Sequence, residues 1–176
     1  MTVRSKLLLE TPRFQIARLT HHDIHGNEHS REVVRHPGAV TIIPLLAKEM
    51  VCLIRNYRVA VDQTLIELPA GTRDPHEDPR ETALRELAEE TGYRAGSIEQ
   101  VHSFYMSPGI LDERMDVFVA RDLQPGKPLL DSGEQIETLV VPWDRAIQMV
   151  REGAIQDAKT IAALLLYHFQ RSRVES

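Results

Sequence analysis

The chain has 176 residues, a length that suits one domain with at most a small appendage. Its hydrophobic content of 42% argues against a disordered protein, and its excess of acidic over basic residues, 26 to 21, argues against nucleic-acid binding. No apolar stretch approaches the ~20 residues of a membrane span and no leader is recognisable, so we expect a cytoplasmic protein without a membrane partner.

The first third of the chain has the pattern of β-structure interrupted by turn residues. Strand-like runs at 13–21 and 30–36 flank His25-Gly26-Asn27, which predicts an N-terminal β-hairpin that ends before Pro37-Gly38. Further strands are predicted at 39–46, 50–55 and 65–69.

The clearest predicted helix follows. Asp78 is in the position of its N-cap, Pro79 in the first helical position, and Glu81 where a capping box places an acid. Gly92 is well placed to end the helix.

The rest of the chain mixes strands and helices without regular alternation. Strands are predicted at 114–120 and 136–141, and helices at 144–152 and from Asp157 to about Arg171. This order favours an α+β fold or an α/β sandwich over a doubly wound sheet.

The predicted helix carries three carboxylates on one side. At about 100° per residue, Glu86, Glu89 and Glu90 gather opposite an apolar side that can pack on a sheet. The apolar side consists of Leu84, Leu87, Ala88 and Thr91. Arg85 can pair with Glu89 at i+4 and offset the repulsion between the carboxylates. Taken alone, this side is either a solvated surface or a cation site.

The spacing around the helix favours the second interpretation. Read from Gly71, the chain carries Glu77, Arg85, Glu86, Leu87, Glu89, Glu90, Gly92 and Tyr93 at fixed offsets. This pattern resembles the Nudix box, Gly-x5-Glu-x7-Arg-Glu-U-x-Glu-Glu-x-Gly-U, in which U is bulky and apolar; only the aromatic Tyr93 is unusual. The resemblance implies an α+β fold, an α/β/α sandwich, here with an N-terminal β-hairpin extension.

The resemblance also implies a chemistry, the metal-dependent hydrolysis of a nucleoside diphosphate linked to another moiety. Mg²⁺ or Mn²⁺ suits this reaction and prefers oxygen ligands. The implied ligands are Glu86, Glu90, Glu89 as an additional or bridging ligand, and the backbone carbonyl of Ala70. Arg85 and Glu77 would orient the carboxylates, and Arg85 and Glu89 join the catalytic candidates.

Three segments outside the box are similar to the ADP-ribose pyrophosphatase branch. They are Ser107-Pro108-Gly109 with its flanks, Arg31–Val40, and Arg55–Arg58 with Glu67–Gly71. The resemblance implies hydrolysis of ADP-ribose to AMP and ribose 5-phosphate. Another nucleotide sugar, such as GDP-mannose or a UDP-sugar, stays an alternative, as does a non-catalytic nucleotide-sensing Nudix module.

The same branch implies roles for residues outside the box. The substrate-binding candidates are Arg58 at a phosphate, Glu113 at the terminal ribose or a nearby water, Arg31 and Glu32 at the adenine end, Phe14 and Ser107. Phe14 either stacks on the base or simply packs. In this branch the N-terminal strands contribute to a homodimer, so residues 1–37 are expected to mediate dimerisation and residues 38–176 to form the hydrolase domain.

The catalytic base is the least determined part of the site. Glu134 is in the position of an acid that reaches the attacking water, whereas Ser132 replaces an acid often found two positions earlier. Glu134, Glu113 and Asp131 therefore all stay candidates.

Overall fold

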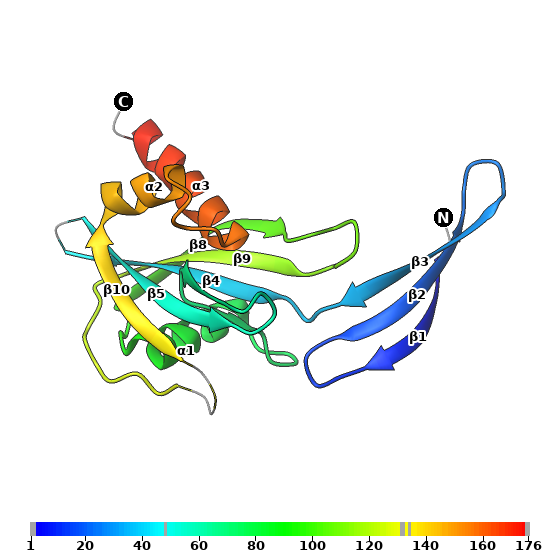
Figure 1. The fold of residues 1–176 in the computed structure, drawn as a ribbon, viewed down its shortest axis with the longest axis horizontal. Coiled ribbons are helices and arrows are strands. Elements are labelled where there is room, and N and C mark those ends of the chain that lie inside the picture. Colours follow the sequence, from blue (N-terminus) through cyan, green and yellow to red (C-terminus); the bar gives the residue numbers. More distant parts are fainter. Residues whose placement is uncertain (1–2, 48, 131–132, 134, 175–176) are drawn as a thin grey trace.

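The computed structural model of the chain describes residues 3–47, 49–130, 133 and 135–174. In this part of the chain, a small antiparallel sheet precedes a larger mixed sheet that carries the helices (Figure 1). None of the described helices is both long and apolar enough to cross a membrane.

The small N-terminal sheet consists of β1 (Arg4–Glu10), β2 (Gln15–His22) and β3 (Glu28–Arg35). The predicted hairpin corresponds to β2 and β3 and is confirmed, whereas β1 was not predicted. Figure 1 shows that this sheet extends away from the rest of the molecule. It is tied to the loop between the strands at 97–105 and 114–121 by hydrogen bonds, including one from the Val34 amide to the Ile110 carbonyl (2.8 Å) and one from Arg35 Nη1 to Asp112 Oδ2 (2.6 Å).

The larger sheet holds the remaining strands of the described chain. They are β4 (Ala39–Leu46), β5 (Met50–Arg58), β6 (Gln63–Glu67), β7 (Ala70–Thr72), β8 (Ser97–Tyr105), β9 (Arg114–Arg121) and β10 (Ile136–Pro142). The order is β10-β5-β4-β9-β8, with β6 paired to β5 and β7 to β4, and the β4–β9 pair is parallel. Strand β8 was not predicted.

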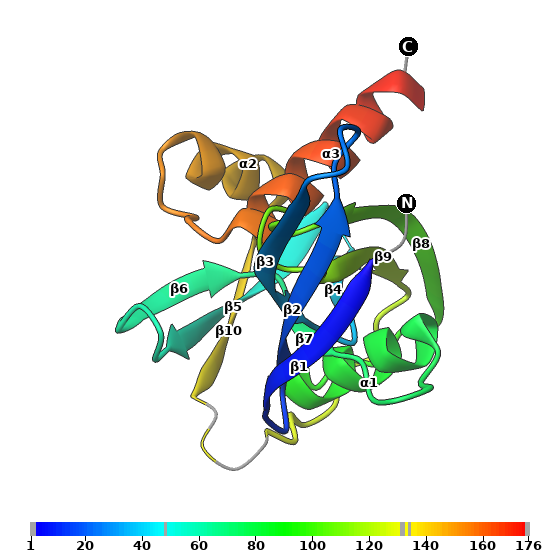
Figure 2. The ribbon, with the colours of Figure 1, turned by 90° about the vertical axis from the view of Figure 1, so that its right-hand side faces the viewer.

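Helices cover both faces of this sheet. Helix α1 (Pro79–Thr91) packs Ala83 and Leu87 against Val40, Ile42 and Phe118 of the sheet. The opposite face is covered by α2 (Trp143–Arg151) and α3 (Ala158–Val174), as Figure 2 shows from the side of the N-terminal sheet. The predicted α/β/α sandwich is therefore confirmed.

Local signals set the ends of α1. The Asp78 side chain accepts a hydrogen bond from the Arg80 amide (2.8 Å), Pro79 begins the helix, and Gly92 adopts a left-handed φ of 76°. The Gly92 amide donates to the Ala88 carbonyl (2.9 Å) and closes the last turn. The predicted bounds of α1 are thus confirmed, while α2 and α3 each begin one residue from the predicted start.

Candidate active site

The carboxylate side of α1 lies against the short strand β7. Glu90 is 4% exposed, and its Oε2 accepts a hydrogen bond from the Ala70 amide (2.9 Å). Thr91 and Thr82 are also buried, whereas Leu84 and Ala88 are only partly buried. The apolar side packs on the sheet through the buried Leu87, as predicted, and β7 covers part of the carboxylate side.

Gly71 allows this close approach between helix and strand. A Cβ atom added to Gly71 would overlap the carboxyl group of Glu86, so any larger residue would displace that side chain. The first residue of the box pattern therefore has a steric role: it makes room for the Glu86 carboxylate beside the β7 backbone.

Arg85 links the acidic residues of the box. Its Nη1 donates to Glu86 Oε1 (2.8 Å) and Glu89 Oε2 (3.0 Å), which confirms the predicted i,i+4 pair. Its Nε and Nη2 both donate to Glu77, each at 3.1 Å, so the loop before the helix is tied to it. These bonds from Arg85 lower the pKa of Glu77 to about 2 and raise that of Arg85.

The donor types in this region fit a hard divalent cation. Glu86, Glu89, Glu90 and the carbonyl of Ala70 supply only oxygen, the ligand atom that Mg²⁺ and Mn²⁺ prefer. Within the described residues no three carboxylate, imidazole or thiol groups already converge as a metal cluster. Arg85 instead bridges two of the carboxylates, and the third accepts from β7.

These carboxylates line a cavity of about 380 Å³, which we call the acidic cavity. Arg13, Arg58 and Arg85 also line it, so the cavity presents both cations and carboxylates. Its lining is Pro12, Arg13, Asn56, Arg58, Ala70, Gly71, Thr72, Asp74, Arg85, Glu86, Glu89 and Glu90. Such a lining suits a ligand that carries phosphates together with a cation.

A second cavity of about 280 Å³, the Glu113 cavity, shares Arg58 and all of β7 with the first. Glu113 lies in its wall, and its Oε1 is 3.8 Å from Nδ1 of His36. Arg58 therefore lies at the border of two cavities, where one ligand could contact both.

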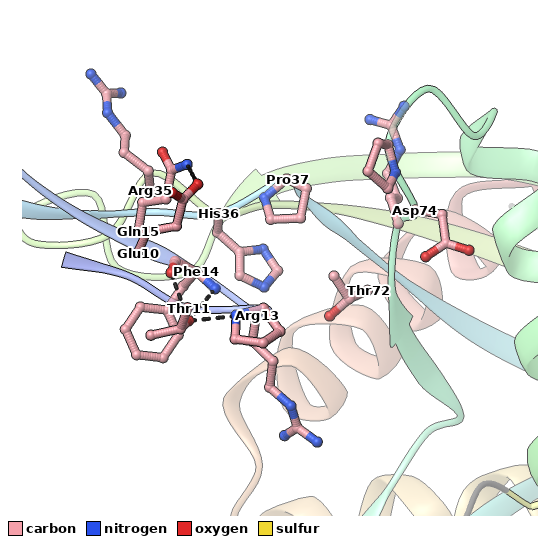
Figure 3. Close-up of a pocket in the computed structure, with 13 residues that line it drawn as sticks. Glu10, Thr11, Arg13, Phe14, Gln15, Arg35, His36, Pro37, Thr72 and Asp74 are labelled. Atoms are coloured by element: carbon pink, nitrogen blue, oxygen red, sulfur yellow. Dashed lines mark hydrogen bonds between the residues drawn. The ribbon is translucent and has the colours of Figure 1, made fainter. Parts of the chain in front are cut away.

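A third cavity of about 520 Å³, the Phe14 cavity, lies between the N-terminal sheet and the loop after β7. Figure 3 shows Arg13, Phe14 and His36 on one side of this cavity and Thr72 and Asp74 on the other. Phe14 remains 37% exposed, so part of its surface is available for contact with a ligand.

Arg58 belongs to a largely buried network of ion pairs centred on Glu67. Arg58 donates through Nε and Nη2 to the two oxygens of Glu67 (2.8 and 2.6 Å), and Glu67 is fully buried. Lys159 also donates to Glu67 (2.5 Å) and pairs with Asp157 (2.9 Å). Burial raises the pKa of Glu67, but the bonds from Arg58 and Lys159 outweigh it and keep the pKa below the ordinary value.

The sequence analysis did not identify Lys159 or Asp157. One signal was available: a lysine in the first turn of a helix opposes the helix dipole, which suggests a specific carboxylate partner. The neighbouring Thr160 reinforces the link, because its hydroxyl bonds Asp157 (2.6 Å) and accepts from the Leu68 amide (2.8 Å).

Other predicted residues lie apart from these cavities. Glu32, on an exposed part of β3, pairs with Arg18 (2.7 Å), and neither Arg31 nor Glu32 lines the acidic, Glu113 or Phe14 cavity in the described chain. Ser107 is exposed, and its carbonyl accepts from the Ile110 and Leu111 amides in a turn. Glu134, Asp131 and Ser132 lie outside the described residues.

Curated relatives are identical to this chain at more than a third of the aligned positions. The methanol dehydrogenase activator of Bacillus methanolicus is 38% identical over 84% of this chain and 80% of its own length. The ADP-ribose pyrophosphatase of Bacillus subtilis is 38% identical over 79% of this chain and 76% of its own length. The GDP-mannose pyrophosphatase of Salmonella typhimurium is 37% identical over 83% of this chain and 80% of its own length.

Structural comparison gives the same fold. The crystal structure of an ADP compounds hydrolase superposes with a TM-score of 0.83, covering 96% of this chain and 92% of that one at 23% identity. A family model described as the NUDIX domain matches residues 35–164. With the box residues around β7 and α1, these matches confirm the resemblance seen in the sequence: the chain belongs to the Nudix family.

Proposed function

We propose that this protein is a cytoplasmic, metal-dependent Nudix hydrolase that cleaves the pyrophosphate bond of a nucleoside diphosphate sugar. We take ADP-ribose, split into AMP and ribose 5-phosphate, as the leading substrate. The observation that carries the proposal is the position of Arg58 at the border of the acidic cavity and the Glu113 cavity. A diphosphate at this border would have one end in each cavity.

Arg58 is suited to bind the diphosphate. A guanidinium has five N–H donors, and Glu67 uses two of them, so the others are available to phosphate oxygens. The bidentate bond to Glu67 fixes the plane of the guanidinium, which lowers the entropy lost when a phosphate binds.

We propose that Glu86, Glu89, Glu90 and the carbonyl of Ala70 hold Mg²⁺ or Mn²⁺. When bound, such an ion supplies charge neutralisation at phosphoryl oxygens and lowers the pKa of a water molecule. Arg85 and Glu77 keep the helix carboxylates in place, and Arg85 also balances their charge. The proposed roles in catalysis fall to Arg85 and Glu89.

For the general base we propose Glu134, with Glu113 and Asp131 as the alternatives. Glu113 already lies in the wall of its cavity beside His36. Measuring kcat against pH for Glu134→Gln, Asp131→Asn and Glu113→Gln tests the assignment. The base is the residue whose variant no longer shows the rise in kcat with increasing pH.

At the nucleoside end we propose that Phe14 stacks on the base and that Ser107 lines the opposite side of the substrate. Arg31 and Glu32 would complete the adenine end from the partner subunit of a homodimer, because neither lines the acidic, Glu113 or Phe14 cavity among the described residues of its own chain.

Residues 1–37 are proposed to mediate dimerisation and residues 38–176 to form the hydrolase domain. Every residue of β1 is exposed, and Leu7, Leu8 and Leu9 present 42–51% of their surface. An exposed apolar sheet of this kind is a common interface. Light scattering is expected to give a dimer for the wild type and a monomer for Leu7→Glu; a monomeric wild type would overturn this part.

Incubation with ADP-ribose and Mg²⁺, with products identified by mass, tests the function. We expect AMP and ribose 5-phosphate, and we expect Glu90→Gln to lower kcat by at least a hundredfold, in the range of a lost catalytic ligand. GDP-mannose is the second candidate, since a GDP-mannose pyrophosphatase is among the relatives. A higher kcat/KM for GDP-mannose would replace ADP-ribose, whereas equal rates for wild type and Glu90→Gln would favour the nucleotide-sensing module.

A further inference from the structure

Asn56 is a buried polar residue in the wall of the acidic cavity. It lies on β5, two residues before Arg58, and only 7% of its surface is exposed. Residues two apart on a strand point to the same face, so Asn56 and Arg58 project from β5 on the same side. Glu86 and Glu90 line the same cavity.

The structure gives Asn56 no obvious structural role. Its backbone pairs with Leu65 of β6 and Ile136 of β10, and its side chain lines the acidic cavity. Asparagine is depleted in strands, so strand propensity does not explain this residue at this position. The neighbouring inward residue of the same strand is the fully buried Ile54.

The charge of the surroundings indicates what an amide could bind there. A carboxylate at this position would add a further negative charge beside Glu86, Glu89 and Glu90, and a lysine would compete with a bound cation. A neutral carboxamide instead supplies two N–H donors without changing the charge of the cavity. A phosphate oxygen between Arg58 and the helix carboxylates accepts such a donor.

We propose that the side-chain amide of Asn56 donates a hydrogen bond to a non-bridging phosphate oxygen of the substrate, beside the contact made by Arg58. Asn56 is then a substrate-binding residue of the diphosphate site. This inference rests on the proposed function, because it takes the diphosphate to lie in the acidic cavity.

The leucine variant separates this role from a structural one. Asn56→Leu keeps the branched shape of the side chain and removes both donors. We expect kcat/KM for the nucleotide sugar to fall at least tenfold while Tm stays close to that of the wild type, because the new side chain has the same branching. A loss of Tm together with an unchanged kcat/KM would overturn the proposal.

The aspartate variant tests which end of the amide acts. Asn56→Asp keeps an oxygen acceptor, loses the donors and adds charge, so kcat/KM should fall at least as far as in Asn56→Leu. Activity retained by Asn56→Asp would mean that the acceptor oxygen matters and would refute the donor role. Arg55→Leu, exposed on the other side of the same strand, is the matched control and should stay within twofold of wild type.

Binding measurements distinguish failure of the inference from failure of the proposed function. If the wild type hydrolyses none of the nucleotide sugars, the proposed function is wrong. Calorimetry with ADP and Mg²⁺ then still tests the phosphate contact of Asn56. At least tenfold weaker binding of ADP to Asn56→Leu than to the wild type supports the contact, and equal binding overturns it. Active wild type with an equally active Asn56→Leu refutes the inference alone.

Discussion

Arg58 of β5 reaches along the paired strand β6 to Glu67 in a bidentate ion pair, with Nε–Oε1 at 2.8 Å and Nη2–Oε2 at 2.6 Å, although the strand register places Arg58 opposite Gln63. Arg58 borders two cavities, whereas Glu67 is fully buried. Lys159 binds the same carboxylate from α3. The exposed cation is therefore oriented by a carboxylate that no substrate can reach.

Replacing Glu67 tests this arrangement. Glu67→Gln leaves Arg58 and Lys159 without their shared counter-charge, so we expect the free energy of unfolding to fall by about 3 kcal/mol. We also expect KM to rise about tenfold with a smaller change in kcat, because the orientation of Arg58 is lost. Urea unfolding and steady-state kinetics measure the two effects. The exposed Glu99→Gln is the control, and an unchanged KM in Glu67→Gln would contradict the positioning role.

Gly71→Ala tests the close contact between β7 and α1. The new Cβ would overlap the Glu86 carboxyl group, so we expect this side chain to turn away, with little loss of stability and at least a tenfold fall in kcat. Gly109→Ala is the matched control, since a Cβ there meets no atom within 4 Å. Equal kinetics for the two alanine variants would show that the Glu86 position is not important for activity.

The Glu77–Arg85 pair predicts a pH dependence of stability. The pKa of Glu77 falls from 4.5 to about 2 on folding, so the ionised form stabilises the protein above pH 4.5. This contribution is lost as the pH falls from 4.5 toward 2, where the folded protein also binds the proton.

Glu77→Gln should therefore be less stable than wild type by about 2 kcal/mol at pH 7. The difference in unfolding free energy should narrow between pH 5 and pH 2. Denaturant unfolding in the presence of a chelator measures it without a contribution from bound metal. A gap that stays constant over this range would show that the Glu77 charge contributes nothing.

Phe14→Ala separates stacking from packing. Because Phe14 is 37% exposed and lines its cavity, we expect an unchanged Tm and a rise in KM of about five- to tenfold, the loss of about 1 kcal/mol of ring contact. Phe169→Ala, which removes a ring that is 62% exposed on α3, serves as the control. A lower Tm with constant KM would instead identify Phe14 as a packing residue.

The elements predicted well are those with local signals. The ends of α1 follow from Asp78, Pro79 and Gly92, each acting on its own neighbours in the chain. Strand β8 lacks such signals, because the bulge between Gln100 and His102 breaks the alternation of its side chains. Strand β1 was missed for a related reason: its three consecutive leucines do not alternate with polar residues.

The same contrast between local signals and long-range contacts holds for the site. The spacing from Gly71 to Tyr93 identified the carboxylates, but the helical projection could not show that β7 covers Glu90. Asn56 and Lys159 depend on contacts between distant parts of the chain, and neither belongs to a local motif. Residue types and offsets therefore gave the family and its chemistry, whereas burial and partners required the folded chain.

The bond from Lys159 to Glu67 spans 92 residues of sequence. During translation, β5 and β6 are made well before α3, so Lys159 reaches Glu67 only after α3 has been made and has packed on the sheet. The protein would then hydrolyse its substrate only after α3 docks. A chain released before α3 is complete would carry an incompletely oriented Arg58.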